Sequence, residues 1–209
     1  MRILPDGAAE VVSAVIRLRR SIKPADFSDR PVDQATVRQL LEAAHLAPTH
    51  GMTEPWRFTV FMGSARLELA EFLARVLQQI TPQAETLVGK AEKLKRAIQA
   101  APCCLAIGMH RQRSGKIPEV EEISAVACAV QNLHLLATAL GMAGYWSSGL
   151  AICSTAFRDY LGLQDEDRVL GLFYLGYPAA EWPSGTRSSL DGRIVWRCGA
   201  ESGSCSERL

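Results

Sequence analysis

Arg19-Arg20-Ser21-Ile22-Lys23 puts three cations and a hydroxyl side by side, directly after an apolar stretch with helical periodicity. A second stretch, from Ala47 to Trp56, is rich in Pro, His and Gly, and it opens into the strand-like residues 57–61. Basic residues at a helix end, followed by such a loop, suit an anionic cofactor that needs charge and close backbone approach. The basic run has a second interpretation, a helix C-terminus whose cations complement the macrodipole.

Composition bounds the class of protein. The 209 residues are 48% hydrophobic and 22% charged, which is enough apolar material for the core of one soluble domain. A net charge of +1, with Lys and Arg scattered, argues against nucleic acid as a partner. The apolar stretches are too short to span a bilayer, and residues 1–7 lack a signal-peptide pattern, so we expect a cytoplasmic location without membrane attachment. The six cysteines form no disulfide pattern and are interpreted as buried free thiols.

Apolar periodicity predicts one α+β domain over residues 1–209, with a central sheet, surrounding helices and flexible ends at about 1–8 and 198–209. Helices are expected over six segments: 8–18, Asp33 to just before Pro48, 69–80, 83–100, 120–140 and 155–161. Strands are expected over 58–62, 103–109, 145–146 and 168–175. The 120–140 helix is apolar over more than half its circumference, which indicates burial at the subunit centre or across a dimer interface. Ile194-Val195-Trp196 is strand-like but isolated, so we expect it to join a sheet, and specifically that of a neighbouring subunit.

Several common catalytic patterns are absent. The chain has no CxxC or HExxH, and Pro48 separates His45 from His50, so the sequence predicts no metal site and the histidines are interpreted as core or satisfied polar residues. The segment 144–149 lacks the Gly-x-Ser-x-Gly spacing of a serine hydrolase, and neither a P-loop nor Gly-x-Gly-x-x-Gly occurs. The remaining candidates are groups that suit a flavin, which needs cations for its phosphate and donors along its pyrimidine edge.

Four motifs in order resemble the FMN-dependent nitroreductase family, in particular its short single-domain branch, from about residue 12 to about residue 197. They are Arg19-Arg20-Ser21, then Ala47-Pro48 with Pro55-Trp56-Arg57-Phe58, then the long helix leading into Gly144-Tyr145-Trp146-Ser147-Ser148-Gly149, and finally Gly171 to Gly176-Tyr177-Pro178. The resemblance implies the family's fold, with a central, mostly antiparallel sheet surrounded by helices. It also implies a homodimer with FMN sites at the interface.

The same resemblance assigns the candidate cofactor-binding residues. It implies that Arg19, Arg20 and Ser21 bind FMN, with Lys23 at the pyrimidine edge and Arg187 at the phosphate. It also implies that His50 reaches FMN across the dimer interface and that Trp146, Ser147 and Ser148 lie beside the ring. Two of these keep a structural alternative. Arg187 is equally an exposed arginine of the tail, and Trp146 either packs or lines the flavin. Trp56 is interpreted as a core or interface anchor.

Three positions depart from the family pattern. Glu54 stands where the family usually has Gln, and it adds a negative charge near the site. Leu46 and Ser147 stand where the short branch tends to have cations. The departures weaken phosphate or substrate-anion binding unless Arg187 or Arg193 compensates.

The implied activity is ping-pong hydride transfer from NADH or NADPH, through FMN, to a nitroaromatic or quinone acceptor. The flavin carries this chemistry, so no catalytic side chain is assigned. Two alternatives remain open: a different flavin enzyme on the same fold, such as a dehydrogenase, a dehalogenase or a flavin-fragmenting enzyme, and a flavin-binding module without turnover. The polar loop 111–118 is where a different specificity would lie.

Overall fold

Six α-helices and four strands are present in the residues that this computed structural model describes, 4–80 and 86–197. The helices are α1 (Ala8–Leu18), α2 (Gln34–His45), α3 (Ala65–Ile80), α4 (Thr86–Ala100), α5 (Glu119–Ala139) and α6 (Thr155–Tyr160). The strands are β1 (Trp56–Met62), β2 (Cys103–Met109), β3 (Ala143–Ser147) and β4 (Arg168–Gly176). Two 3₁₀ turns, Pro24–Asp26 and His50–Met52, complete the regular structure.

The strands form one antiparallel sheet in the order β1-β2-β4-β3. Every residue of β2 is buried, as expected of a central strand covered on both faces, and β4 is buried over most of its length. β1 and β3 are the edge strands. The outer edge of β3 is bridged by Ser21, which lies parallel to Gly144, whereas no described strand pairs with the outer edge of β1.

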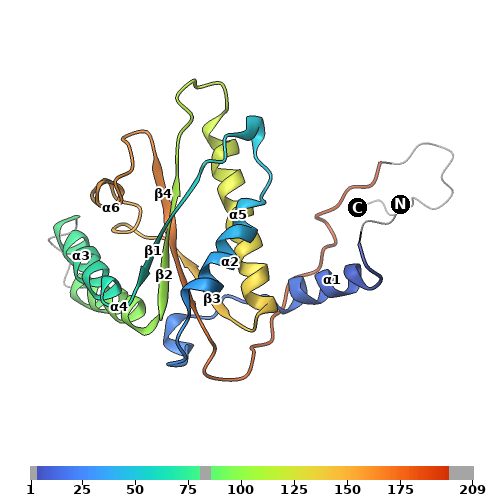
Figure 1. The fold of residues 1–209 in the computed structure, drawn as a ribbon, viewed down its shortest axis with the longest axis horizontal. Helices are drawn as coiled ribbons and strands as arrows, with labels where there is room; N and C mark the ends of the chain where they lie inside the picture. The colour runs from blue at the N-terminus through green and yellow to red at the C-terminus, as the bar shows by residue number, and fades with distance from the viewer. Residues whose placement is uncertain (1–3, 81–85, 198–209) are drawn as a thin grey trace.

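Helices cover both faces of the sheet (Figure 1). α2 and α5 pack on one face, where residues such as Leu40, Val126 and Leu133 meet Leu105 and Phe173 in one buried cluster. α3, α4 and α6 cover the other face through a second cluster. The sheet therefore separates two apolar cores, and the alternation of side chains along each strand supplies both.

α5 is the longest helix and lies against the sheet beside α2. Glu119, Glu121 and Glu122 occupy its first turn, where negative charge favours the helix N-terminus. Gly141 follows its C-terminus with φ 70°, a left-handed conformation that glycine adopts at little cost. α5 is thus fixed at both ends and buried along the side that faces the sheet.

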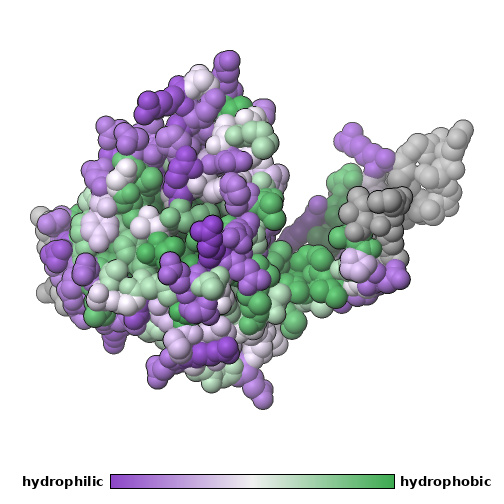
Figure 2. All heavy atoms as spheres, viewed as in Figure 1, coloured by the Kyte–Doolittle hydropathy of each residue, from purple (hydrophilic) through white to green (hydrophobic). Residues whose placement is uncertain are grey.

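α1 lies apart from this arrangement. It extends away from the rest of the molecule beside the segment that follows β4 (Figure 1), and none of its residues is buried. Apolar residues gather on its surface and where β1 meets α2 (Figure 2). On α1 they include Val11, Val12, Ile16 and Leu18, each more than half exposed. The predicted helix over 8–18 is present, but its apolar side has no cover in one chain.

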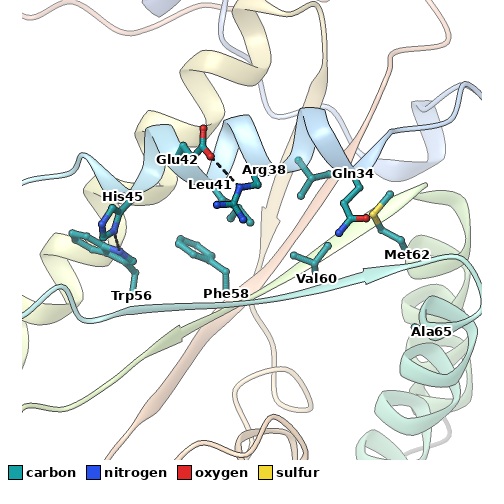
Figure 3. A pocket seen from close by; sticks show the side chains of 11 residues that line it. Gln34, Arg38, Leu41, Glu42, His45, Trp56, Phe58, Val60, Met62 and Ala65 are labelled. Carbon is teal, nitrogen blue, oxygen red and sulfur yellow. Dashed lines mark hydrogen bonds and ion pairs between the residues drawn. The ribbon is translucent and has the colours of Figure 1, made fainter.

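A groove of about 710 Å³ runs between α2 and the edge strand β1 (Figure 3). Val37, Leu41, Phe58, Val60 and Met62 are among the apolar side chains that line it. Where the groove ends, the Nε1–H of Trp56 donates to His45 Nδ1 at 3.1 Å, and Arg38 pairs with Glu42 on the outer side of α2. Trp56 is 7% exposed, so its interpretation as an anchor is confirmed.

The predicted α+β class and the antiparallel sheet between helices are confirmed, with the element bounds shifted by a few residues. Residues 194–196 form no strand within one chain and are exposed, so their expected pairing with the sheet of a neighbouring subunit stays a prediction. One expectation is wrong: Cys128 and Cys153 are exposed, whereas Cys103 and Cys104 are buried as expected. The expected helical residues 83–85 and the tail 198–209 lie outside the described residues, as do residues 1–3 of the expected flexible start.

None of the described helices is long and apolar enough to span a bilayer. Among the described cysteines, burial raises the pKa of Cys103 to about 12 and raises that of Cys104 as well, which makes both thiols poor nucleophiles.

Candidate functional site

The segment 19–22 runs along the outer edge of β3. α1 ends at Leu18, Arg19 leaves the helix with φ −51° and ψ 124°, and Ile22 N–H donates to Gly144 O at 3.1 Å. Arg19 and Arg20 are half-buried, while Ser21 and Lys23 are exposed. The chain is thus fixed at the sheet edge, where Ser21 and Lys23 are open to solvent.

Arg20 serves the end of α1 and also retains an unused donor. Its Nη1 donates to the carbonyls of Arg17 at 2.6 Å and Arg19 at 2.7 Å, so the interpretation as a helix-terminal cation is correct in part. Its Nε is buried without a hydrogen-bond partner in the described structure. A Cβ on Gly185 would lie 2.0 Å from this Nε, so a larger residue at this position would displace the Arg20 guanidinium.

The segment after β4 brings Arg187 to the same place. Trp182 Nε1–H donates to Leu18 O at 2.6 Å, which holds this segment against the end of α1. Partial burial, followed by the charges of Arg187 and Arg20, lowers the pKa of Arg19. Arg19, Arg20 and Arg187 therefore form one group of repelling cations, here called the basic cluster. Within residues 4–80 and 86–197, no carboxylate forms an ion pair with any of the three.

Trp146, Ser147 and Ser148 follow Gly144 along the same strand edge. The Trp146 indole lies over Gly171, where a Cβ would sit 2.1 Å from its Nε1, and this Nε1–H donates to Leu170 O at 3.2 Å. The ring is 37% exposed, so it packs on one side and remains open on the other. Ser147 is half-buried and Ser148 is exposed. Gly144 and Trp146 are two residues apart, about 7 Å in a strand, so the basic run and the open indole share one edge.

His50 lies elsewhere. Its Nδ1 contacts the Glu121 carboxylate at the first turn of α5. Along α5, Glu121 is 13 residues before His134, or about 20 Å of helix rise. Since His134 contacts the carbonyl of Arg20, His50 and the basic cluster stand at opposite ends of α5 in one chain. The structure does not bring His50 to the other predicted site residues.

The loop that carries His50 has an unusual backbone. Met52 and Glu54 have positive φ values of 54° and 43°, which for non-glycine residues indicates local strain of the kind often found at functional sites. Thr49 Oγ1 holds the turn by contacting Thr53 Oγ1 at 3.0 Å and accepting from Glu54 N–H at 3.3 Å. Of the departures from the family pattern, Glu54 is half-buried here, whereas Leu46 is 82% exposed and contributes nothing to the core.

Two buried carboxylates fix the start of loop 111–118. Glu122 is 1% exposed; it pairs with the Arg111 guanidinium and accepts from Gln112 N–H at 3.1 Å. Asp167 accepts from Arg111 N–H at 2.8 Å and from Gln164 N–H at 2.9 Å. Burial opposes ionisation of Asp167, but these N–H groups and His110 outweigh it and lower its pKa. Sequence reasoning did not identify either residue, because their partners lie on other elements.

His134 is a buried histidine with a hydrogen-bonded ring, as expected, although its partner was not predicted. It is 6% exposed, its Nε2–H donates to Arg20 O at 3.0 Å, and its ring meets Phe173 edge-on at 5.1 Å. Burial, followed by the charge of Arg19, lowers its pKa to about 4, although the hydrogen bond to Arg20 O opposes this shift. In the sequence, residues 123–139 contain no Asp, Glu, Lys or Arg, and His134 is their only histidine. No other feature of the sequence distinguishes it.

Comparison with known proteins identifies the family. The model described as "Nitroreductase family" matches residues 16–177. The chain belongs to the nitroreductase family. A Bacillus subtilis protein with the provisional name NAD(P)H nitroreductase YfhC is 30% identical over 80% of this chain and 84% of its own length. A 5,6-dimethylbenzimidazole synthase from Rhodospirillum rubrum is 32% identical over 182 residues, which cover 82% of this chain and 84% of the synthase.

Solved structures agree on the fold. A nitroreductase-like protein from Bacillus cereus superposes with a TM-score of 0.78, at 24% identity, over 95% of this chain and all of that one. A nitroreductase from Desulfovibrio desulfuricans, solved in complex with FMN, gives 0.68 at 25% identity over 90% and 96% of the two chains. The nitroreductase-like fold predicted from the sequence motifs is confirmed.

The lowered pKa of His134 predicts a pH-dependent stability. Between pH 6.5 and about 4 the unfolded chain binds a proton at this ring that the folded chain does not, so the free energy of unfolding falls as the pH is lowered through this range. The lowering of the His134 pKa from 6.5 to about 4 corresponds to a loss of about 3 kcal/mol in the free energy of unfolding. Urea unfolding at several pH values should show this loss in the wild type and a smaller loss in His134→Gln. An identical pH dependence in both proteins would contradict the assignment.

Proposed function

We propose that this protein is an FMN-dependent oxidoreductase that uses NADH or NADPH and reduces nitroaromatic or quinone-type acceptors. The observation that carries the proposal is the convergence of Arg19, Arg20 and Arg187 at the edge that also presents the open face of Trp146. When bound, FMN would supply the redox chemistry that links hydride transfer from the nicotinamide to reduction of the acceptor in a ping-pong cycle. The relatives support this reading, because several bear names of NAD(P)H nitroreductases and two solved neighbours contain FMN.

The residues present fit the phosphate of FMN. Arg20 Nε is a buried donor without a partner, and the basic cluster has no described counter-charge. A phosphate dianion would accept a hydrogen bond from Arg20 Nε and would balance the positive charge of the cluster, since guanidinium groups bind phosphate through charge-assisted hydrogen bonds. Ser21 and Lys23 add a hydroxyl and an ammonium group on the exposed side of the same edge.

The chain itself does three things in this proposal. The basic cluster binds the phosphate, and the backbone contact between Ile22 and Gly144 orients it. Trp146 gives the ring an aromatic neighbour that Gly171 keeps close to the sheet. No described side chain is assigned as a proton donor, because the exposed edge admits water.

The site is completed by a second copy of the chain. His50 and the basic cluster lie at opposite ends of α5, and a two-fold axis across α5 brings the His50 end of one copy beside the cluster of the other. The exposed side of α5 suits such contact: between Ile123 and Ala139 it has no Asp, Glu, Lys or Arg. The uncovered apolar residues of α1 provide further surface for the partner.

The C-terminal segment extends this dimer. Ile194, Val195 and Trp196 are 43%, 71% and 73% exposed, an unusual state for a strand-like apolar segment. The outer edge of β1 has no partner among the described strands, and the adjacent groove is apolar. We assign the segment to that edge in the neighbouring copy, where it gains a backbone partner and covers the groove.

The first test is the visible spectrum of the purified protein during anaerobic addition of NADH and then NADPH. A flavin band that bleaches and then returns with a nitroaromatic or quinone is the expected result, and it identifies the donor. A flavin band that neither nicotinamide bleaches would contradict the enzymatic proposal and favour a flavin-binding module. Protein that stays colourless after addition of FMN would contradict flavin binding altogether.

The relative from Rhodospirillum rubrum favours a second candidate, a flavin enzyme with a different reaction on the same fold. Repeated cycles of reduction and reoxidation in air separate the two. A nitroreductase recovers its flavin band in full after each cycle, whereas a flavin-fragmenting enzyme loses it irreversibly.

Arg19→Ala should weaken FMN binding by about 1.5–3 kcal/mol, the contribution of a hydrogen bond to a charged group. Fluorescence titration of FMN with apoprotein measures the change. Arg75→Ala is the matched control, since Arg75 is an exposed arginine on α3, on the far side of the sheet. Unchanged affinity in Arg19→Ala would remove this residue from the site.

Deleting residues from Gly192 onward should dissociate the dimer and reduce FMN retention, because the apolar segment 194–196 is lost. Sedimentation velocity and flavin content measure the two effects, and a control truncation after Arg197 keeps the segment. A stable, FMN-bound dimer without residues 192–209 would contradict the strand exchange.

A further inference from the structure

His134 lies where three parts of the chain meet. It belongs to α5, its ring packs edge-on against Phe173 of β4, and it contacts the segment that carries Arg19 and Arg20. A Cβ on Gly144 would come within 3.0 Å of its Cδ2 and Nε2, so β3 also approaches it closely. The imidazole is therefore enclosed by two strands and by the backbone of the basic run.

The contact with this backbone has a defined polarity. The acceptor is the carbonyl oxygen of Arg20, at 3.0 Å, so Nε2 must carry the proton. The charged groups near the ring are Arg19 and its neighbours in the basic cluster, which disfavour a second positive charge there. His134 is thus a neutral donor that adds no charge of its own beside the cations.

The hydrogen bond constrains the segment at a second point. Ile22 N–H is bound to Gly144 O on one side of Ser21, and Arg20 O is bound to His134 on the other. Two contacts on either side of one residue fix its peptide planes, whereas one contact leaves the chain free to rotate. The carbonyl of Arg20 is held toward the core, away from the edge where an anion would be repelled by it.

We propose that His134 is a positioning residue for the flavin phosphate, acting through the carbonyl of Arg20 to set the orientation of Arg19, Arg20 and Ser21. This role rests on the proposed function and adds to it a residue that touches neither cofactor nor substrate. In this proposal, the side chain that preorganises the phosphate site lies 114 positions after Arg20 in the sequence.

The alternative is that His134 only fills space under β3, and two replacements separate these roles. His134→Leu keeps an apolar group but removes the donor, leaving the carbonyl of Arg20 buried and unpaired. His134→Gln restores an N–H at about the distance of Nε2 from the backbone. Thr138→Val is the control, because this buried hydroxyl lies one turn further along α5 and donates only to His134 O within the helix.

FMN affinity of the full-length apoprotein is the main readout, by fluorescence titration, with amide hydrogen exchange at Ile22 in the absence of FMN as the second. We expect His134→Leu to raise the FMN dissociation constant about tenfold or more and to accelerate exchange at Ile22. His134→Gln should stay within about threefold of the wild type, as should Thr138→Val.

Two results would overturn the positioning role while leaving the proposed function intact. One is wild-type FMN affinity in His134→Leu. The other is an equal loss of FMN affinity in His134→Leu and His134→Gln that follows their loss of thermal stability. That result would indicate that His134 acts through packing alone. A wild-type protein that fails to bind FMN removes both the proposed function and this role.

Discussion

The packing of α5 against the sheet and against α2 is the constraint on which the rest of the structure depends. Val126, Val130 and Leu133 are buried against β2 and β4, and each contributes about 1.5–3 kcal/mol through burial. Ala125 and Ala129 of α5 are buried in the same cluster as Leu40 and Ala44 of α2. Because α5 is held so firmly, its two ends are fixed points from which the loops of the site are positioned.

Each end of α5 organises one group of polar residues. At the N-terminal end, Glu122 fixes the start of loop 111–118 and Glu121 contacts His50. Toward the C-terminal end, His134 holds the backbone of the basic run against β3. A single chain therefore separates the two groups by most of the helix length, and the proposed dimer is the arrangement that would bring them together. The uncharged outer side of α5 is consistent with that arrangement.

The sequence predicted the elements well wherever the determining interactions are local. The all-apolar residues 103–109 and the continuous periodicity of 120–140 correspond to β2 and α5 with small shifts at the ends. The helix expected from Asp33 begins there, and Asp33 caps α2 by accepting from Thr36 N–H at 2.7 Å. Such signals depend on neighbours within a few residues, so periodicity and capping rules are sufficient to find them.

The sequence did not predict contacts between distant positions. The acceptor of His134 is 114 positions away, and the approach of Gly185 to Arg20 spans 165 positions. Ile194 to Trp196 has the composition of a strand but is unpaired within the described chain, so its predicted partner is not seen in one copy. The family motifs identified the candidate site residues, but not the hydrogen bonds that orient them.

The central claim is that each flavin site is built from two copies of the chain. Sedimentation velocity with detection at the visible flavin band, over a dilution series of the FMN-loaded protein, tests it most directly. The account predicts that bound flavin sediments only with the dimer, and that free flavin appears in step with monomer. A monomer that carries FMN would contradict it.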